Sequence, residues 1–302
     1  MERNIETYVD SMELLSDPAG LRARAKAEGY LFFKGLLPAE PLLEVRRQIL
    51  EILGRHGFLD RQAELMEGRM DMEKVAQSVP FEGCTEEVYK EVQRLESFHR
   101  LSHHPELLRI YEALFDAPVL PHPRNIARIL FPGPQARATP PHQDFPHIQG
   151  SRQTWTAWFP LGDCPIELGG LSVLRGSHND GILDVKESEG AGGLECILRD
   201  TESVWMRADF ELGDVLTFLS TNVHQGLPNQ WGNLARLSCD FRYQPMNEPV
   251  EEKSLLPHCF VMEWEEIYKG WKNTDLQYYW KDNQLEKTPW DESIRGSKPS
   301  VY

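Results

Sequence analysis

The first third of the chain combines one short apolar run with amphipathic stretches of helical period. Residues 29–36 (GYLFFKGL) form a compact apolar run that ends near Gly35 and Pro38, which predicts a strand. Apolar side chains then recur at helical spacing after Pro41, between about residues 86 and 100, and again after Pro105. These stripes predict three helices whose apolar faces pack against a core.

Between Asn125 and Tyr243 the pattern changes to short apolar or alternating runs separated by Gly, Pro and Asn. Many short strands with this punctuation are typical of an antiparallel sandwich or barrel. The predicted strands cover residues 126–131, 154–159, 171–174, 203–206, 214–219 and 236–243.

The tail after Pro245 is rich in Trp, Tyr and acidic residues, and a helix over 261–272 is expected to pack back on the barrel. The chain contains no internal repeat and no low-complexity linker. We therefore expect one domain over residues 1–302. It has a helical N-terminal part at about 1–120, a β core at about 121–245 and a C-terminal extension at 246–302.

Composition narrows the range of partners. The net charge of -15, from 47 acidic and 32 basic residues, argues against a large nucleic-acid surface, which needs clustered Lys and Arg. No apolar run approaches ~18 residues, so no membrane span is expected. The five cysteines show no C-x-x-C spacing, and the N-terminus does not resemble a secretory signal. Reduced thiols and a cytoplasmic location are the expectation.

A candidate metal site lies in the segment PPHQDFP, residues 140–146. His142 and Asp144 are two residues apart, and on a strand such residues point to the same face. His224, in TNVHQGLPN after an apolar strand, is the best candidate for a third ligand. Two His and one carboxylate form the facial triad of Fe(II) oxygenases, but three ligands also suit catalytic zinc. A second H-x-D, at His178, falls in a turn-rich stretch and is interpreted as a loop histidine bonded to backbone.

A strongly polar strand face follows His224 by twelve residues. Over residues 236–242, polar side chains alternate with Leu237, Cys239 and Phe241; they are Arg236, Ser238, Asp240 and Arg242. If this face points inward, its charges need partners. A dicarboxylate is such a partner, because Arg offers a carboxylate a planar pair of donors and Ser238 adds a hydroxyl.

Several runs, in this order, resemble the phytanoyl-CoA dioxygenase family of Fe(II)/2-oxoglutarate oxygenases. They are PPHQDFPHIQGSRQTWTAWFPLGD, ELGGLSVLRGSH, GDVLTF, VHQGLPN and ARLSCDFRYQP, and the resemblance spans about residues 29–245. It implies a mainly β fold with helical additions around a double-stranded β-helix, a jelly-roll or cupin-like core. It also implies Fe(II) on His142, Asp144 and His224.

The same resemblance implies a site for 2-oxoglutarate as co-substrate. Arg236 is expected to anchor it with support from Ser238. For Arg242 the alternatives are that it shares or takes over the anchoring role, or that it meets the metal-side carboxylate or the substrate. Trp155 and Arg128 fall where the family lines the co-substrate pocket.

The implied activity is hydroxylation of a small organic molecule by O2, with release of succinate and CO2. Asp144 fills the carboxylate position, which favours hydroxylation over halogenation. Two alternatives stay open: a cupin-like protein that binds a metal or small acid without turnover, and a zinc hydrolase. The sequence does not identify the prime substrate or the oligomeric state, and it shows no basic cluster for a CoA phosphate.

Overall fold

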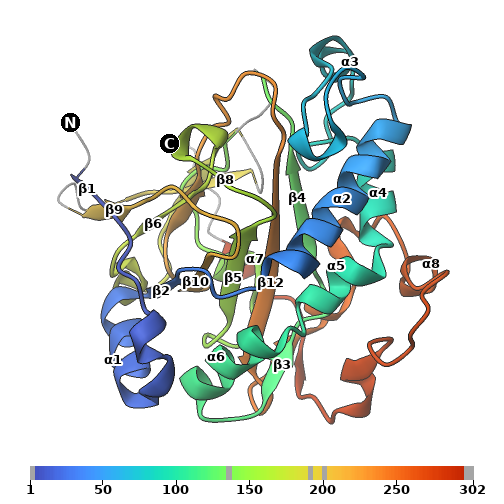
Figure 1. The fold of residues 1–302 in the computed structure, drawn as a ribbon. Helices are drawn as coiled ribbons and strands as arrows, with labels where there is room; N and C mark the ends of the chain where they lie inside the picture. The colour runs from blue at the N-terminus through green and yellow to red at the C-terminus, as the bar shows by residue number, and fades with distance from the viewer. Residues whose placement is uncertain (1–3, 134–137, 190–192, 199–202, 296–302) are drawn as a thin grey trace, which may run out of the picture.

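Two facing sheets form a jelly roll in the computed structural model, which describes residues 4–133, 138–189, 193–198 and 203–295 (Figure 1). The larger sheet has the order β2-β10-β5-β12-β3, and β4 also pairs with β12. Its strands are β2 (Tyr30–Phe33), β3 (Val119–Pro121), β4 (Ile126–Leu130), β5 (Trp155–Pro160), β10 (Val215–Leu219) and β12 (Arg236–Pro245).

The smaller sheet has the order β1-β9-β6-β11. Its strands are β1 (Asn4–Glu6), β6 (Leu171–Leu174), β9 (Val204–Met206) and β11 (His224–Gly226). His142 extends it through an isolated antiparallel bridge to His224, with both backbone hydrogen bonds at 2.9 Å. Two small pairs join β7 (Val185–Glu187) to β8 (Leu194–Cys196) and β13 (Val250–Glu251) to β14 (Lys287–Thr288).

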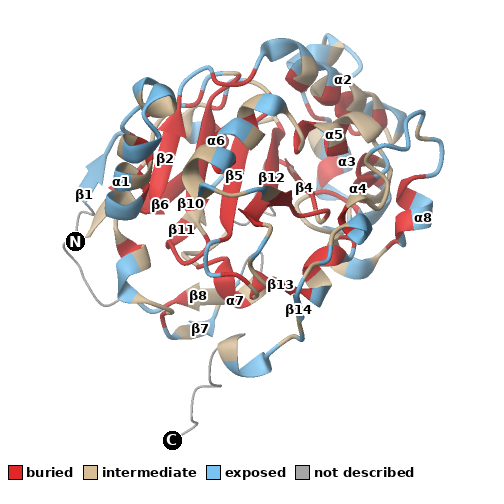
Figure 2. Cartoon of the chain, turned by 90° about the horizontal axis from the view of Figure 1, so that it is seen from below, coloured by how far each residue is buried: buried red, intermediate tan, exposed pale blue. Residues whose placement is uncertain are grey.

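Helices from the N-terminal part of the chain cover the outer face of the larger sheet (Figures 1 and 2). Side chains of Asp17, Asp71 and Thr85 cap three of them by accepting backbone N–H bonds. These helices are α1 (Pro18–Glu28), α2 (Ala39–Arg55), α3 (Met72–Ala76), α4 (Glu86–Gln93), α5 (Glu96–Leu101) and α6 (Pro105–Phe115). The single helix predicted over 86–100 is two helices, because Leu95 adopts an extended backbone and begins α5.

The period-two alternation of β12 separates the two sides of the larger sheet. Leu237, Cys239 and Phe241 belong to the core between this sheet and the helices. The opposite face of the sheet packs toward the smaller sheet, where Trp158 and Phe218 join a second apolar cluster. The polar residues of β12 therefore point between the two sheets, into the jelly roll.

The C-terminal segment packs on the sheet edge that carries β3. Trp264, Tyr268 and Trp280 form an aromatic cluster with Leu120 of β3. The helix predicted over 261–272 is only the single turn α8 (Trp264–Ile267), and Gly270 has a φ of 90°, outside the helical region.

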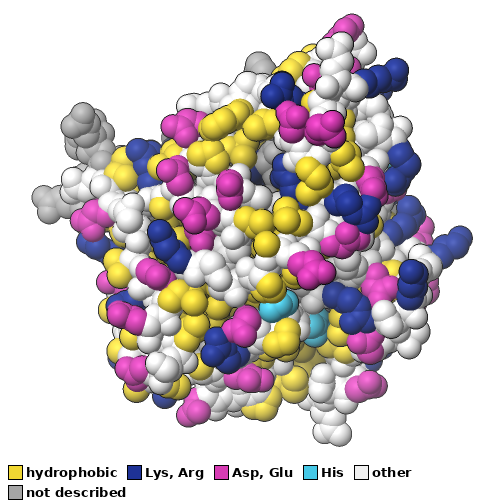
Figure 3. Space-filling view, in the orientation of Figure 1, with side chains coloured by type: hydrophobic (Ala, Val, Ile, Leu, Met, Phe, Trp, Pro, Cys, Tyr) yellow, Lys and Arg dark blue, Asp and Glu magenta, His cyan; other side chains and the backbone are white. Residues whose placement is uncertain are grey.

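Acidic and basic side chains are interspersed on the face of the molecule shown in Figure 3, so neither sign of charge dominates there. Within the described ranges, no helix is both long and apolar enough to cross a membrane.

Candidate active site

The three side chains predicted to bind a metal converge in the jelly roll. Nε2 of His142 and Nε2 of His224 each lie 3.9 Å from Oδ1 of Asp144, and the two imidazole rings are 4.1 Å apart. The candidate ligand atoms all lie within 4.8 Å of one another. One ion placed between them could contact all three, which is the geometry of a facial triad.

Backbone carbonyls determine which nitrogen each histidine presents. Nδ1 of His142 lies 2.8 Å from the carbonyl oxygen of Pro140, and Nδ1 of His224 lies 3.2 Å from that of Asn222. A carbonyl can only accept, so each Nδ1 carries the proton and each Nε2 keeps a lone pair facing Asp144. Burial, and then the nearby His224, lowers the pKa of His142 to about 3, so both rings are held neutral.

Asp144 is buried and held ionised by its neighbours. Thr156 Oγ1 donates a hydrogen bond of 2.6 Å to Oδ2, and Arg242 Nη2 lies 3.4 Å from both carboxylate oxygens. Burial alone would raise the pKa of Asp144, but the charge of Arg242 and the hydrogen bond from Thr156 hold it well below its usual value. Arg242 therefore lies against the carboxylate of Asp144.

The strand geometry expected for His142 and Asp144 is only half right. His142 is a bridge residue of the smaller sheet, but Asp144 has helical dihedral angles and begins α7 (Phe145–Ile148). The chain turns between them, and the carboxylate reaches the histidines from the first turn of that helix. The convergence thus comes from a strand-to-helix turn instead of a shared strand face.

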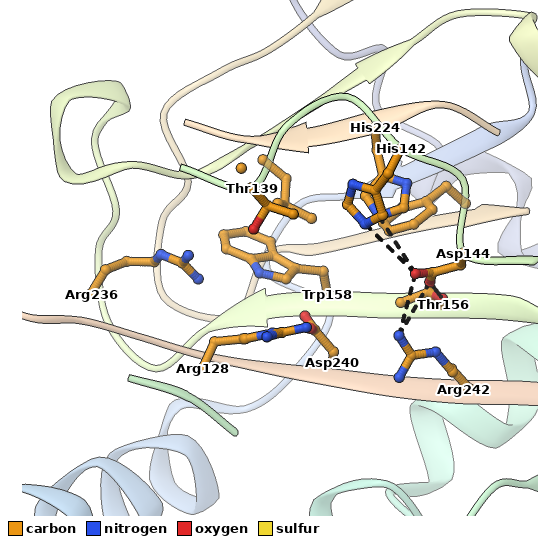
Figure 4. A pocket seen from close by; sticks show the side chains of 13 residues that line it. Arg128, Thr139, His142, Asp144, Thr156, Trp158, His224, Arg236, Asp240 and Arg242 are labelled. Atoms are coloured by element: carbon orange, nitrogen blue, oxygen red, sulfur yellow. Dashed lines mark hydrogen bonds and ion pairs between the residues drawn. The ribbon is translucent and has the colours of Figure 1, made fainter. Parts of the chain in front are cut away.

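Arg236 lies at the opposite end of the same cavity from the triad, with Trp158 between them (Figure 4). It is 6% exposed, and its Nη1 donates to the hydroxyl of Ser238. Among the described residues no carboxylate forms an ion pair with Arg236, and its buried Nε has no hydrogen-bond partner. Burial lowers its pKa. A buried guanidinium in this state needs an anion.

Arg128 lines the same cavity, but its charge is already compensated. Its Nε donates to Asp240 at 2.9 Å and its Nη1 to Glu82 at 3.0 Å. Two carboxylates leave it little attraction for a further acid, so it acts as a wall of the cavity.

The prediction for Trp155 is wrong. Trp155 packs in the core on the helix side of the sheet, together with Ala157 and Phe159. Because side chains alternate along β5, it is Thr156 and Trp158 that line the cavity. The guanidinium carbon of Arg236 lies over the indole ring of Trp158, 5.8 Å from the ring centre. His178 lies apart from the site, with Nε2 bonded to the carbonyl of Lys26, as expected for a loop histidine.

Comparison with known proteins identifies the group to which this architecture belongs. The profile of the phytanoyl-CoA dioxygenase family matches residues 25–234, which include all three triad residues. The chain belongs to the phytanoyl-CoA dioxygenase family. Enzymes of this family are Fe(II)- and 2-oxoglutarate-dependent oxygenases, and the chain is an enzyme of that class with Fe(II) and 2-oxoglutarate as its cofactors.

Two curated relatives in this family are hydroxylases. The 1-deoxypentalenic acid 11-beta-hydroxylase of Streptomyces exfoliatus is 27% identical over 271 residues, covering 85% of this chain and 92% of the relative. The enzyme of the same name from Streptomyces arenae is 26% identical over 275 residues.

Solved structures of the family share the fold. The alpha-ketoglutarate-dependent epimerase SnoN from nogalamycin biosynthesis aligns with a TM-score of 0.52 at 21% identity, over 77% of this chain and 85% of SnoN. EvdO2 from Micromonospora carbonacea var. aurantiaca, complexed with 2-oxoglutarate, aligns with a TM-score of 0.50 at 17% identity, over 74% of this chain and 89% of EvdO2. These likenesses confirm the predicted jelly-roll core. SnoN is an epimerase whereas the two curated relatives are hydroxylases, so the fold alone does not fix the reaction.

Three residues that line the cavities of this phytanoyl-CoA dioxygenase family member were not predicted from the sequence. They are Thr139, Thr156 and Arg124. Thr156 left a signal, because it is a polar residue in the apolar run TWTAWFP at the same alternation as Trp158. Arg124 and Thr139 lie in Pro-rich segments without periodicity, and nothing in their local sequence distinguishes them.

Proposed function

We propose that His142, Asp144 and His224 hold Fe(II), that Arg236 anchors the distal carboxylate of 2-oxoglutarate, and that the enzyme hydroxylates a small organic molecule. When bound, iron and 2-oxoglutarate supply the oxidising chemistry: one oxygen atom of O2 enters succinate as CO2 leaves, and the other forms the product hydroxyl. The single observation that carries the assignment is Arg236, a buried guanidinium without an acidic partner among the described residues, facing the same cavity as the triad.

The protein's own residues supply position and charge. The carbonyls of Pro140 and Asn222 orient the two imidazoles, and Thr156 orients the carboxylate. Ser238 accepts from Arg236, so the hydroxyl directs the guanidinium and keeps its own proton for a ligand oxygen. Trp158 and Phe218 give the cavity apolar walls that exclude water from the reacting groups.

A direct test measures succinate formed from 2-oxoglutarate in the presence of Fe(II) and O2. The wild type should release succinate, and Asp144→Ala should not. Arg236→Gln should raise the Kd for 2-oxoglutarate about a hundredfold, because it removes a charge-assisted pair of hydrogen bonds. Arg175→Gln, which removes a guanidinium paired with Glu6 at the surface, is the matched control and should leave the Kd unchanged.

Two outcomes would contradict the assignment. Activity with Zn²⁺ that is indifferent to O2 would indicate a hydrolase. Binding of metal and acid without any succinate would indicate a binding protein of the same fold.

The cellular location and the domain organisation of the protein are part of the same proposal. All five cysteines are free, which supports a reducing, cytoplasmic location. The N-terminal helices and the C-terminal aromatic cluster both pack on the larger sheet, which supports one domain over 1–302 with parts near 1–120, 121–245 and 246–302. The partners are then a small-molecule substrate and O2.

A further inference from the structure

A second cavity shares the triad wall with the co-substrate cavity. Both are lined by His142, Asp144 and Arg242. The co-substrate cavity leads to Arg236, whereas the second leads to Arg124 and encloses about 680 Å³, counting space open to solvent. A molecule in the second cavity would lie beside the metal position without taking the place of 2-oxoglutarate.

Three guanidinium groups line the second cavity, and two of them are compensated. Arg128 pairs with Glu82 and Asp240, and Arg242 lies against Asp144. No ion pair joins Arg124 to a carboxylate in the part of the chain that the structure describes. The three guanidinium groups thus face three carboxylates, but Arg124 is the one that has no carboxylate at ion-pair distance among the described residues. The charge of opposite sign that acts on it most strongly is the buried carboxyl group of Glu251, which forms no ion pair with it.

Arg124 is fixed in place by the C-terminal segment. Its Nε donates to the carbonyl of Leu256 at 3.0 Å and its Nη2 to the carbonyl of Lys253. The ring of Phe260 covers the guanidinium, 4.8 Å from its carbon. Neutral carbonyls hold the group without neutralising it, and the hydrogen bonds of the described residues leave Nη1 for another acceptor. Burial, and then the charge of Arg242, lowers the pKa of Arg124 to about 10.

The remaining walls of this cavity include apolar side chains. Ile126 of β4 and Ile148 at the end of α7 are both almost fully buried and line the same cavity as Arg124 and the triad residues His142 and Asp144. A ligand that pairs with Arg124 and also packs against these apolar side chains has an anionic end and an apolar body.

We propose that the prime substrate is a hydrophobic carboxylic acid whose carboxylate pairs with Arg124, while its apolar body lies along Ile126 and Ile148 beside the triad. This inference rests on the proposed function, since it places the substrate relative to the proposed iron ligands. It also gives the C-terminal extension a role, because Lys253 and Leu256 position the arginine.

A second metal site at the same wall is the competing interpretation. Glu82, His258 and Cys259 bring potential ligand atoms within 4.8 Å of one another. Glu82 is already paired with Arg128, and the Tyr89 hydroxyl lies 2.5 Å from Nδ1 of His258. Burial, and then the positive charges of Arg128 and Arg124, lowers the pKa of His258. The positive charges of Arg128 and Arg124 beside His258 oppose a cation at this position.

The test compares acids with uncharged molecules of the same shape. Anaerobic wild-type protein loaded with Fe(II) and 2-oxoglutarate is titrated calorimetrically with decanoic acid and decanamide, and with adamantanecarboxylic acid and adamantanecarboxamide. Each acid should bind at least tenfold more tightly than its amide. Arg124→Gln should abolish that preference by weakening the acid and leaving the amide unchanged.

Two further measurements distinguish the effect of the charge from a loss of folding. They also distinguish a failure of this inference from a failure of the proposed function. Arg124→Lys keeps the positive charge and should keep an acid preference, even though it loses one of the carbonyl contacts. The Kd for 2-oxoglutarate should not change in either variant. Acids that bind no better than their amides, or a preference that survives Arg124→Gln, would overturn the inference. Failure of the wild type to bind 2-oxoglutarate would instead overturn the proposed function.

Discussion

Thr156 Oγ1 lies 2.6 Å from Oδ2 of Asp144 and donates a hydrogen bond to it. The other oxygen, Oδ1, is the one that lies 3.9 Å from Nε2 of both His142 and His224. The carboxylate therefore has one oxygen held by the protein and one presented toward the histidines. Partners of this kind tune a metal site because they orient the ligand and limit the geometries it can adopt.

Thr156→Val should weaken metal binding while leaving the fold intact. Valine has nearly the same shape but cannot donate, so the carboxylate loses its fixed orientation. We expect the Kd for Fe(II), measured anaerobically, to rise about 10–100-fold. Thr217→Val is the matched control, because Thr217 lies on the neighbouring strand β10 and its hydroxyl bonds Tyr111 on the helix side. An equal loss of affinity in both variants would contradict the role of Thr156.

Arg128→Gln and Arg236→Gln should have opposite effects on the stability of the ligand-free protein. Removing Arg128 leaves Asp240 and Glu82 without their partner, at a cost of about 2–3 kcal/mol in the free energy of unfolding. Removing Arg236 eliminates a buried charge that has no acidic partner, so stability should be unchanged or increased. Urea unfolding without 2-oxoglutarate measures both. A large destabilisation by Arg236→Gln would mean that the arginine is a structural group.

Buried histidines should make the metal-free protein sensitive to acid. Burial lowers the pKa of His99 and of His122 to about 4, from an ordinary value of 6.5. Between about pH 6.5 and about pH 4 the unfolded chain binds more protons than the folded one. Stability is therefore fully present above this window and is lost as the pH falls through it. Urea midpoints measured across the window should decrease steadily, and a constant midpoint would contradict the argument.

Trp158→Phe should lower the affinity for 2-oxoglutarate, and Trp155→Phe should not. The Trp158 indole lies against the Arg236 guanidinium in the cavity, whereas Trp155 packs among apolar residues on the helix side. Loss of the cation–π contact and of the larger indole surface should reduce the binding free energy of 2-oxoglutarate by about 0.5–2 kcal/mol, a difference that calorimetry resolves. Greater sensitivity at Trp155 would restore the original sequence interpretation.

The sequence by itself determined the features that depend on local periodicity. Alternation along 236–242 separated the polar side chains from Leu237, Cys239 and Phe241, and the structure puts the two sets on opposite faces as expected. The helix beginning at Pro105 and the strand after Gly29 were readable for the same reason. The order of the motifs also identified the family, because residue types and spacing survive when most other positions change.

Only the tertiary structure decided which charges compensate each other. Register places Arg128 opposite Ser238, which brings it within reach of Asp240, and Arg236 has no acidic partner among the residues that the structure describes. It also decided that Asp144 approaches the histidines from a helix turn, and that distant carbonyls hold Arg124. The physical reason is that the periodicity of one segment fixes which way a side chain points. The partner it meets comes from a segment far away in the chain, and only the packing of the sheets brings that segment near.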